Sequence, residues 1–305
     1  MRGRRAGRRC RSASNACLIS RRSQAKRRSG RRPKQTLFWV DQLAFRLNAF
    51  DPATGANESW LMPAHVSSFA IRGAGEPIVV ALHTGLFDFD RASGTLTPIA
   101  APPPYPLETH RFNDGRCDRQ GRYIIGSVDL SYYEQQIAGR AALYRLDDRR
   151  LMPIVDDITC SNGIAFSPDG RTMYLADSPA ATVYAFDYDI ETGTPTNRRI
   201  FAERDRNDGI FDGGETDAEG GYWVALLMKG AVARYTPDGR LDREIPVPVL
   251  QPTKIAFGGP DLSTLYLTTA GHRHIPGDQP MGEQAGGLFA IATGFRGIAE
   301  PSYRY

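Results

Sequence analysis

A repeat of about fifty residues is the feature that most constrains the fold of this chain. Three stretches share one layout: a polar residue, an apolar run, a glycine eight residues after the polar one, and a second β-rich run. The polar residues that open them are Asn113, Asn162 and Asp212, so successive repeats are 49 and 50 residues apart. A repeat of this length, built from several short strands, is typical of a β-propeller.

The same phase extends over most of the chain. Strand-like runs begin near Leu37, Ile78, Tyr123, Met173, Tyr222 and Leu265, at intervals of 41, 45, 50, 49 and 43 residues. No apolar pattern with a helical period is sustained, and Gly and Pro bound the strand-like runs. We therefore expect an all-β fold in which residues 35–305 form a six-bladed β-propeller as one domain.

Residues 1–34 differ sharply from the rest in composition. They contain 14 Lys and Arg and no Asp or Glu, which is the composition of a transit peptide or of a nucleic-acid-binding tail. We expect this Arg-rich tail to be disordered or to be a mis-assigned start. Residues 35–305 retain 24 basic and 34 acidic residues, a net charge of about −10 that favours cations over nucleic acid.

Other global features exclude further classes of protein. No apolar run of about 18 residues occurs, so a membrane partner is not expected. The four cysteines have no CxxC spacing, which indicates reduced thiols in a cytoplasmic setting. The oligomeric state leaves no signal in the sequence.

The repeated polar residues predict a site at the hub of the propeller. The first strand of each blade lines the central axis, so Asn113, Asn162 and Asp212 should converge on one small volume. Their amide and carboxylate oxygens are hard ligands, suited to calcium, magnesium or manganese. The alternative is that these residues only begin turns, since Asn, Asp and Gly dominate turns.

Four runs carry a specific resemblance to a known family. They are RFNDGRCDRQGRYIIGS, SNGIAFSPDGRTMYLADS, DGGETDAEGGYWVAL and PTKIAFGGPDLSTLYLTTA. Together, over about residues 35–300, the chain resembles the gluconolactonase, regucalcin (senescence marker protein) and sugar-lactonase family. The resemblance implies a six-bladed hydrolase that opens a sugar lactone, such as a gluconolactone or a pentonolactone, to the aldonic acid. It also implies one divalent metal ion (Ca, Zn, Mn or Mg).

The resemblance also assigns roles to individual residues. Asn162 and Asp212 match two of the family's metal ligands, and Asp212 is then also the candidate general base. Arg111 and Asn113 match the residues that hold the oxygens of the lactone. An arginine near the carbonyl would stabilise the oxyanion by charge-assisted hydrogen bonds.

The first blade departs from the family pattern. The family's inner strand, usually written like EGPVWD, supplies a glutamate ligand; here that motif is absent, and a count from the first turn reaches Lys26. A lysine ammonium there would repel a cation. The alternative function is therefore a non-catalytic calcium- or ligand-binding propeller. Glu215 is a poor substitute for the missing ligand, because strand alternation turns it away from Asp212.

Three smaller groups of polar residues complete the expectations. Asp114 either supports the site residues or is only a partner in the Asx turn of its loop, and the second interpretation is preferred. Asp129 and Asp177 end apolar strands at matching places and are expected to form hydrogen bonds at blade edges. The pair His272–His274 is expected to lie on a loop surface, since no third zinc ligand accompanies it.

Overall fold

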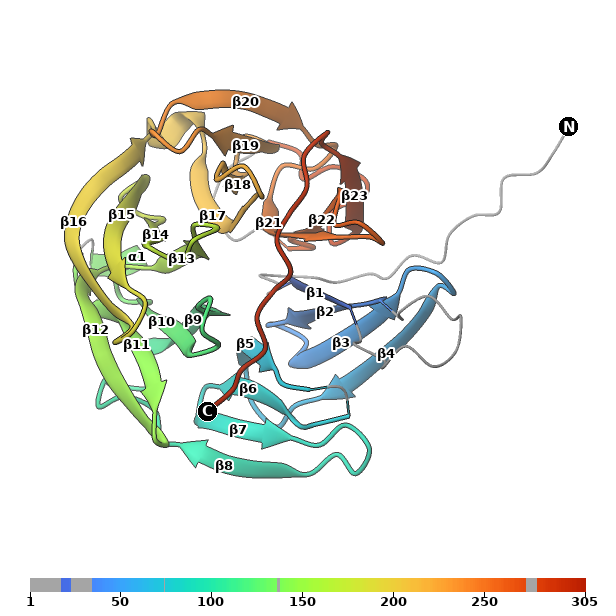
Figure 1. Cartoon of the computed structure of the whole chain (residues 1–305), viewed down its shortest axis with the longest axis vertical. Helices are drawn as coiled ribbons and strands as arrows, with labels where there is room; N and C mark the ends of the chain where they lie inside the picture. Colours follow the sequence, from blue (N-terminus) through green and yellow to red (C-terminus); the bar gives the residue numbers. More distant parts are fainter. Residues whose placement is uncertain (1–17, 23–34, 74, 136–137, 273–278) are drawn as a thin grey trace, which may run out of the picture.

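The computed structural model describes residues 18–22, 35–73, 75–135, 138–272 and 279–305, and it forms a ring of six antiparallel sheets around one axis (Figure 1). In the described residues five sheets have four strands and the sixth has three. The chain is thus a six-bladed β-propeller, as the repeat predicts.

The blades follow one another in sequence. Blade 1 comprises β1 (Leu18–Arg22), β2 (Gln35–Asp41), β3 (Arg46–Asp51) and β4 (Ala56–Leu61). Blade 2 comprises β5 (Val66–Ile71), β6 (Ile78–Leu82), β7 (Gly85–Phe89) and β8 (Leu96–Ala100). Blade 3 comprises β9 (His110–Cys117), β10 (Tyr123–Asp129), β11 (Ala141–Asp147) and β12 (Arg150–Ile158).

The second half of the ring has the same plan. Blade 4 comprises β13 (Ser161–Phe166), β14 (Thr172–Asp177), β15 (Thr182–Asp189) and β16 (Thr194–Glu203). Blade 5 comprises β17 (Ile210–Thr216), β18 (Tyr222–Leu227), β19 (Ala231–Tyr235) and β20 (Leu241–Pro246). Blade 6 comprises β21 (Pro252–Gly258), β22 (Thr264–Thr269) and β23 (Leu288–Ala292). In the part of the chain that the structure describes, two short helices lie in connections: α1 (Tyr132–Gln135) and a 3₁₀ helix, η1 (Arg206–Asp208).

The second strand of every blade begins within two residues of the position that the sequence phase predicts. Within the described residues, no helix has the length and apolar character needed to cross a membrane.

Apolar side chains fill the seams between neighbouring blades. Each of the six buried clusters joins two adjacent blades, because strand side chains alternate and both faces of a blade are covered. The seam that closes the ring, between blades 6 and 1, has the smallest fully buried set in the described residues: Leu37, Trp39 and Ala256. Among the residues whose burial is described, this seam thus has the smallest apolar core.

A strand within residues 1–34 completes the first blade. β1 pairs antiparallel with β2, with Ser20 opposite Leu37, and lies next to β21 of the last blade. The expected tail thus contributes the inner strand of blade 1, although the family's motif is absent from it. Lys26 lies outside the described residues.

Irregular strand pairing marks the inner strand of blades 2 to 6. The register shifts at Val66/Ser68 in β5, between Phe112 and Gly115 in β9, at Asn162/Ala165 in β13, at Phe211/Gly214 in β17 and at Pro252/Lys254 in β21. A bulge bends the strand and redirects its side chains. These five bulges lie at equivalent places and bring the polar residues of the repeat to the axis.

The chain after β23 crosses the ring (Figure 1). The Ala218 amide of blade 5 donates to the Arg296 carbonyl at 2.7 Å, and the Tyr303 amide donates to the Ile71 carbonyl of blade 2 at 2.9 Å. The C-terminal segment therefore ties together blades that are far apart in the sequence.

Candidate functional site

Two of the predicted hub residues are in direct contact. Asn113 of β9 and Asn162 of β13 are 5% and 8% exposed. The Nδ2 of Asn113 donates to the Oδ1 of Asn162 and to the carbonyl of Ser161, both at 2.9 Å. Gly163 follows Asn162 with φ of 57°, and a Cβ there would lie 2.3 Å from the Tyr222 hydroxyl. The Asn-Gly pair is therefore part of the hub packing.

The third predicted residue, Asp212 of β17, follows Phe211 in the sequence. Two hydrogen bonds connect Asn162 to the carbonyl of Phe211. The Nδ2 of Asn162 donates to Ser178 Oγ at 2.7 Å, and that hydroxyl donates to the Phe211 carbonyl at 2.6 Å. Asp212 is 6% exposed, and its Oδ2 has no hydrogen-bond partner among the described residues. The hub thus presents one carboxylate oxygen that is free to accept.

Burial, with a smaller contribution from the nearby Asp114 carboxylate, raises the pKa of Asp212 to about 8, while the Lys254 ammonium acts in the opposite direction. A carboxyl group with a pKa in this range can exchange a proton near neutral pH.

Arg111 lies beside these amides. Its Nη1 donates to Asn113 Oδ1 at 2.9 Å and to the Phe112 carbonyl at 3.0 Å. Among the described residues no carboxylate lies within ion-pair distance of Arg111, so the guanidinium keeps donors for an anionic or polar ligand. The hydrogen bond also fixes the orientation of Asn113, with its Nδ2 toward Asn162.

His65 is a neighbour of Arg111 that the sequence does not single out. Burial lowers the pKa of His65 to about 3, with smaller contributions from Arg111 and His83. The imidazole is neutral at physiological pH, and its Nδ1 lies 3.4 Å from Ser67 Oγ.

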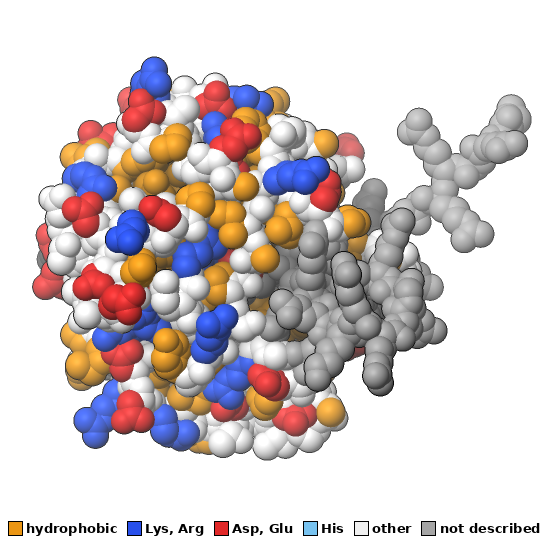
Figure 2. Space-filling view, viewed as in Figure 1, with side chains coloured by type: hydrophobic (Ala, Val, Ile, Leu, Met, Phe, Trp, Pro, Cys, Tyr) orange, Lys and Arg blue, Asp and Glu red, His pale blue; other side chains and the backbone are white. Residues whose placement is uncertain are grey.

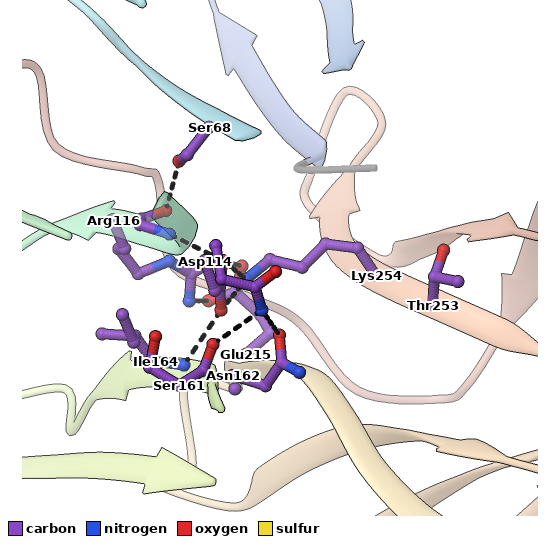
Figure 3. Close-up of polar contacts among 12 residues, drawn as sticks. Ser68, Asp114, Arg116, Ser161, Asn162, Ile164, Glu215, Thr253 and Lys254 are labelled. Atoms are coloured by element: carbon purple, nitrogen blue, oxygen red, sulfur yellow. Dashed lines mark hydrogen bonds and ion pairs between the residues drawn. The ribbon is translucent and has the colours of Figure 1, made fainter. Parts of the chain in front are cut away.

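The expected role of Asp114 is incomplete. Its Oδ1 does accept a local hydrogen bond from the Gly115 amide at 2.9 Å, but the carboxylate is 6% exposed and forms an ion pair with Lys254 of β21 (Figure 3). The Lys254 Nζ lies 2.5 and 2.6 Å from the two oxygens of Asp114. The bulge in β9 is the reason, because it lets the consecutive residues Asn113 and Asp114 both face the axis.

A second buried ion pair lies next to this one (Figure 3). Arg116 donates to the two oxygens of Glu215 at 3.0 and 2.8 Å, and Glu300 of the C-terminal segment lies 3.3 Å from Arg116 Nε. Both carboxylate oxygens of Glu215 are therefore bonded to Arg116, consistent with the expectation that Glu215 does not replace the missing metal ligand.

A signal for Lys254 was present in the sequence. The run IAF occurs in both SNGIAF and PTKIAF, and aligning the two places Thr253 at the position of Asn162 and Lys254 at that of Gly163. Lys254 is therefore expected at the hub. Ser178 and Glu300 have no comparable signal, since neither lies on an inner strand of the repeat.

A divalent ion is compatible with this hub. The described residues contain no group of three His, Cys, Asp or Glu side chains able to hold a metal. The candidate donors are instead Asp212 Oδ2, which is buried without a partner, and Asn162 Oδ1, an amide oxygen with a second lone pair. An unpartnered buried carboxylate is the kind of group that a cation would stabilise. The position in blade 1 that corresponds to Asn162 lies outside the described residues.

The remaining sequence expectations fall outside the hub. Asp177 accepts from the amides of Thr159 and Cys160, both at 3.0 Å, and Asp129 accepts from the amide of Ser131, so both aspartates bond to the connections next to their strands and not to blade edges. Cys117 and Cys160 are buried and form no disulfide within the described part of the chain. His272 lies beside residues 273–278, which are outside the described part of the chain, so the histidine pair is not placed.

Comparisons with known proteins agree with the fold. Residues 30–271 match the family model described as the SMP-30/Gluconolactonase/LRE-like region. The chain is 35% identical over 272 residues to the 6-deoxy-6-sulfogluconolactonase of Pseudomonas putida, covering 88% of this chain and 91% of that protein. It is 32% identical over 276 residues to the pentonolactonase XacC of Haloferax volcanii, covering 88% and 90%. The solved structure of a calcium-binding protein, regucalcin of Agrobacterium tumefaciens, superposes with a TM-score of 0.80 at 30% identity, covering 95% of each chain.

Proposed function

The chain belongs to the SMP-30/gluconolactonase/LRE-like family, and from this premise we propose that it is a divalent-metal-dependent hydrolase that opens a sugar lactone to the aldonic acid. The observation that carries the proposal is the buried carboxylate of Asp212, which has an oxygen without a partner among the described residues and follows Phe211, whose carbonyl is linked through Ser178 to the hub amide of Asn162. Relatives named as lactonases for a sulfogluconolactone and for a pentonolactone support a five- or six-carbon sugar lactone as the substrate.

The hub residues have distinct tasks in this reaction. Asp212 accepts the proton of the attacking water, the part that a positioned carboxylate plays as a general base. Asn113 and Arg111 bind the oxygens of the lactone, and the Arg111 guanidinium stabilises the negative charge that develops on the carbonyl oxygen. Asn162 and Asp212 would hold the metal ion, which when bound polarises the carbonyl and increases the acidity of water.

The test is a lactone assay with variants. We expect acid release above the spontaneous rate from a gluconolactone or a pentonolactone, loss of that release with a chelator, and recovery with Ca²⁺, Mn²⁺, Mg²⁺ or Zn²⁺. The Asp212→Ala variant should lose at least about 10²-fold in kcat/KM, in the range expected for a general base. Asp238→Ala is the matched control, because Asp238 lies in an exposed turn and pairs locally with Arg240. Unchanged turnover in Asp212→Ala would contradict the assignment, and metal binding without any turnover would favour a binding propeller.

A further inference from the structure

A lysine side chain reaches across the hub from one side of the ring to the other (Figure 3). Lys254 is on β21 of blade 6 and Asp114 is on β9 of blade 3, so the two belong to opposite blades of a six-bladed ring. The Lys254 and Asp114 side chains are 5% and 4% exposed, and the Nζ contacts both carboxylate oxygens at 2.5 and 2.6 Å. Both charges are therefore removed from water and depend on each other.

The carboxylate of Asp114 is fully engaged. Besides Lys254, it accepts from the amide of Gly115 at 2.9 Å and from the amide of Ile164 in blade 4 at 3.2 Å. This carboxylate thus connects blades 3, 4 and 6 at the place where the two hub amides meet.

The carboxylate of Asp212, in contrast, is not fully hydrogen-bonded. Its Oδ2 has no hydrogen-bond partner among the described residues. Both members of the ion pair act on it electrostatically: Asp114 raises the pKa of Asp212 and Lys254 lowers it. Of the two charged groups that act on Asp212 in this way, the Lys254 ammonium is bonded to Asp114, and within the described residues it forms no ion pair with Asp212.

We propose that Lys254 is the counter-cation of Asp114 and that this pairing leaves Asp212 as the hub carboxylate that accepts a divalent ion. This inference rests on the metal dependence in the proposed function and adds to it a residue that sets metal affinity. Because like charges repel at short range in a poorly solvated site, the Lys254 ammonium weakens the binding of a divalent ion at Asp212. Lys254 is thus a positioning residue and takes no direct part in the chemistry.

The proposal predicts that removing the positive charge strengthens metal binding. Lys254→Met leaves Asp114 without its partner, so a bound divalent ion gains a second nearby carboxylate and loses a repelling ammonium. We expect the Kd for Ca²⁺ and for Mn²⁺ to fall at least about tenfold, which corresponds to about 1.4 kcal/mol. Lys254→Arg keeps the charge and the pairing with a carboxylate, and its Kd should stay within about threefold of the parent value, a change below about 0.7 kcal/mol.

Two further variants keep the test decisive if Lys254→Met does not fold. Asp114→Asn leaves the ammonium without its carboxylate, so the Kd should rise at least about tenfold. The double variant Asp114→Asn/Lys254→Met removes both charges at once, and replacing a buried ion pair in this way is often tolerated. Its Kd should lie between those of Lys254→Met and Asp114→Asn.

The measurement is isothermal titration calorimetry of the full chain with Ca²⁺ and with Mn²⁺ after chelator treatment, together with melting curves with and without each ion. Equal Kd values in the parent, Lys254→Met and Asp114→Asn proteins would overturn the proposal and leave the pair with a structural role only. No binding in any variant would overturn it as well. The lactone assay separates the two ideas: chelator-sensitive turnover with unchanged Kd values contradicts only the role of Lys254, whereas lack of turnover contradicts the proposed function.

Discussion

At the scale of single residues, Asp212 is the group at which the proposed function and the stability of the fold conflict. Buried polar atoms in folded proteins are nearly always hydrogen-bonded, yet Asp212 Oδ2 has no such partner within the described residues. Keeping a carboxylate in such a place costs folding free energy, and sites of this kind are retained when the activity needs them. The cost should be measurable as a function of pH.

We predict that Asp212→Asn is more stable than the parent protein in chelator at mildly alkaline pH. The folded pKa of about 8 lies above the ordinary value of 3.8, so the favourable contribution of Asp212 is complete below about pH 3.8 and is lost as the pH rises through 8. The variant lacks this loss, and its free energy of unfolding should exceed that of the parent by more than about 1 kcal/mol at pH 8. Urea unfolding of both proteins between pH 4 and 9 gives the difference.

Asp238→Asn, at an exposed turn, serves as the control for this experiment and should follow the parent curve. A constant difference between Asp212→Asn and the parent over the whole pH range would contradict the assigned pKa.

The sequence predicted the hub residues but not all of their partners. The repeat phase identified Asn113, Asn162 and Asp212 because equivalent positions in a ring meet at its axis. It could not identify Ser178, which lies past the end of β14 and reaches the hub only through its hydroxyl. Side-chain contacts across a ring depend on side-chain length and local backbone bends, and neither is visible as a repeat.

At the scale of elements, the bulges of the inner strands explain which expectations held. Glu215 is bonded to Arg116, but the bulge between Phe211 and Gly214 includes Asp212, so strand alternation alone does not fix the directions of Asp212 and Glu215 relative to each other. Asp114, interpreted from the sequence as a partner in an Asx turn, faces the axis because the bulge in β9 turns two consecutive side chains there. Period-two reasoning is therefore valid along a regular strand and fails at the irregular residues that build the site.

The C-terminal segment is a second element whose role is not visible in the sequence. It carries Glu300, whose side chain is 8% exposed, to the Arg116–Glu215 pair. We predict that Arg116→Met destabilises the protein by about 3–5 kcal/mol, because it leaves two buried carboxylates without their cation. Glu300→Gln should cost no more than about 1 kcal/mol, since Glu215 still pairs with Arg116.

Urea unfolding of the two variants at neutral pH measures both values. Equal losses would show that Glu300 is as important to Arg116 as Glu215 is, contrary to the geometry in which only Glu215 bonds with both oxygens.

At the scale of the whole molecule, the number of blades follows from the sequence and the closure of the ring does not. Six regularly spaced strand starts define six blades, and six apolar seams follow from them. β1 gives no such signal, because its segment LISRR has only two apolar residues and lies among arginines. Its pairing comes from the free edge of β2, and an unpaired strand edge in a blade readily accepts another strand.

We predict that removing residues 1–34 weakens the ring at one place. The truncation deletes β1, which leaves the edge of β2 unpaired next to the smallest apolar seam, that of Leu37, Trp39 and Ala256. A loss of about 2 kcal/mol or more should lower the melting temperature by roughly 5 °C. Hydrogen exchange should accelerate in β2 and β21 while β10, β14 and β18 keep their protection, since local opening follows the weakest packing. Deleting only residues 1–17 keeps β1 and should change neither measurement. If both deletions behave alike, β1 does not close the ring, and the larger apolar clusters between the other neighbouring blades hold the propeller together without it.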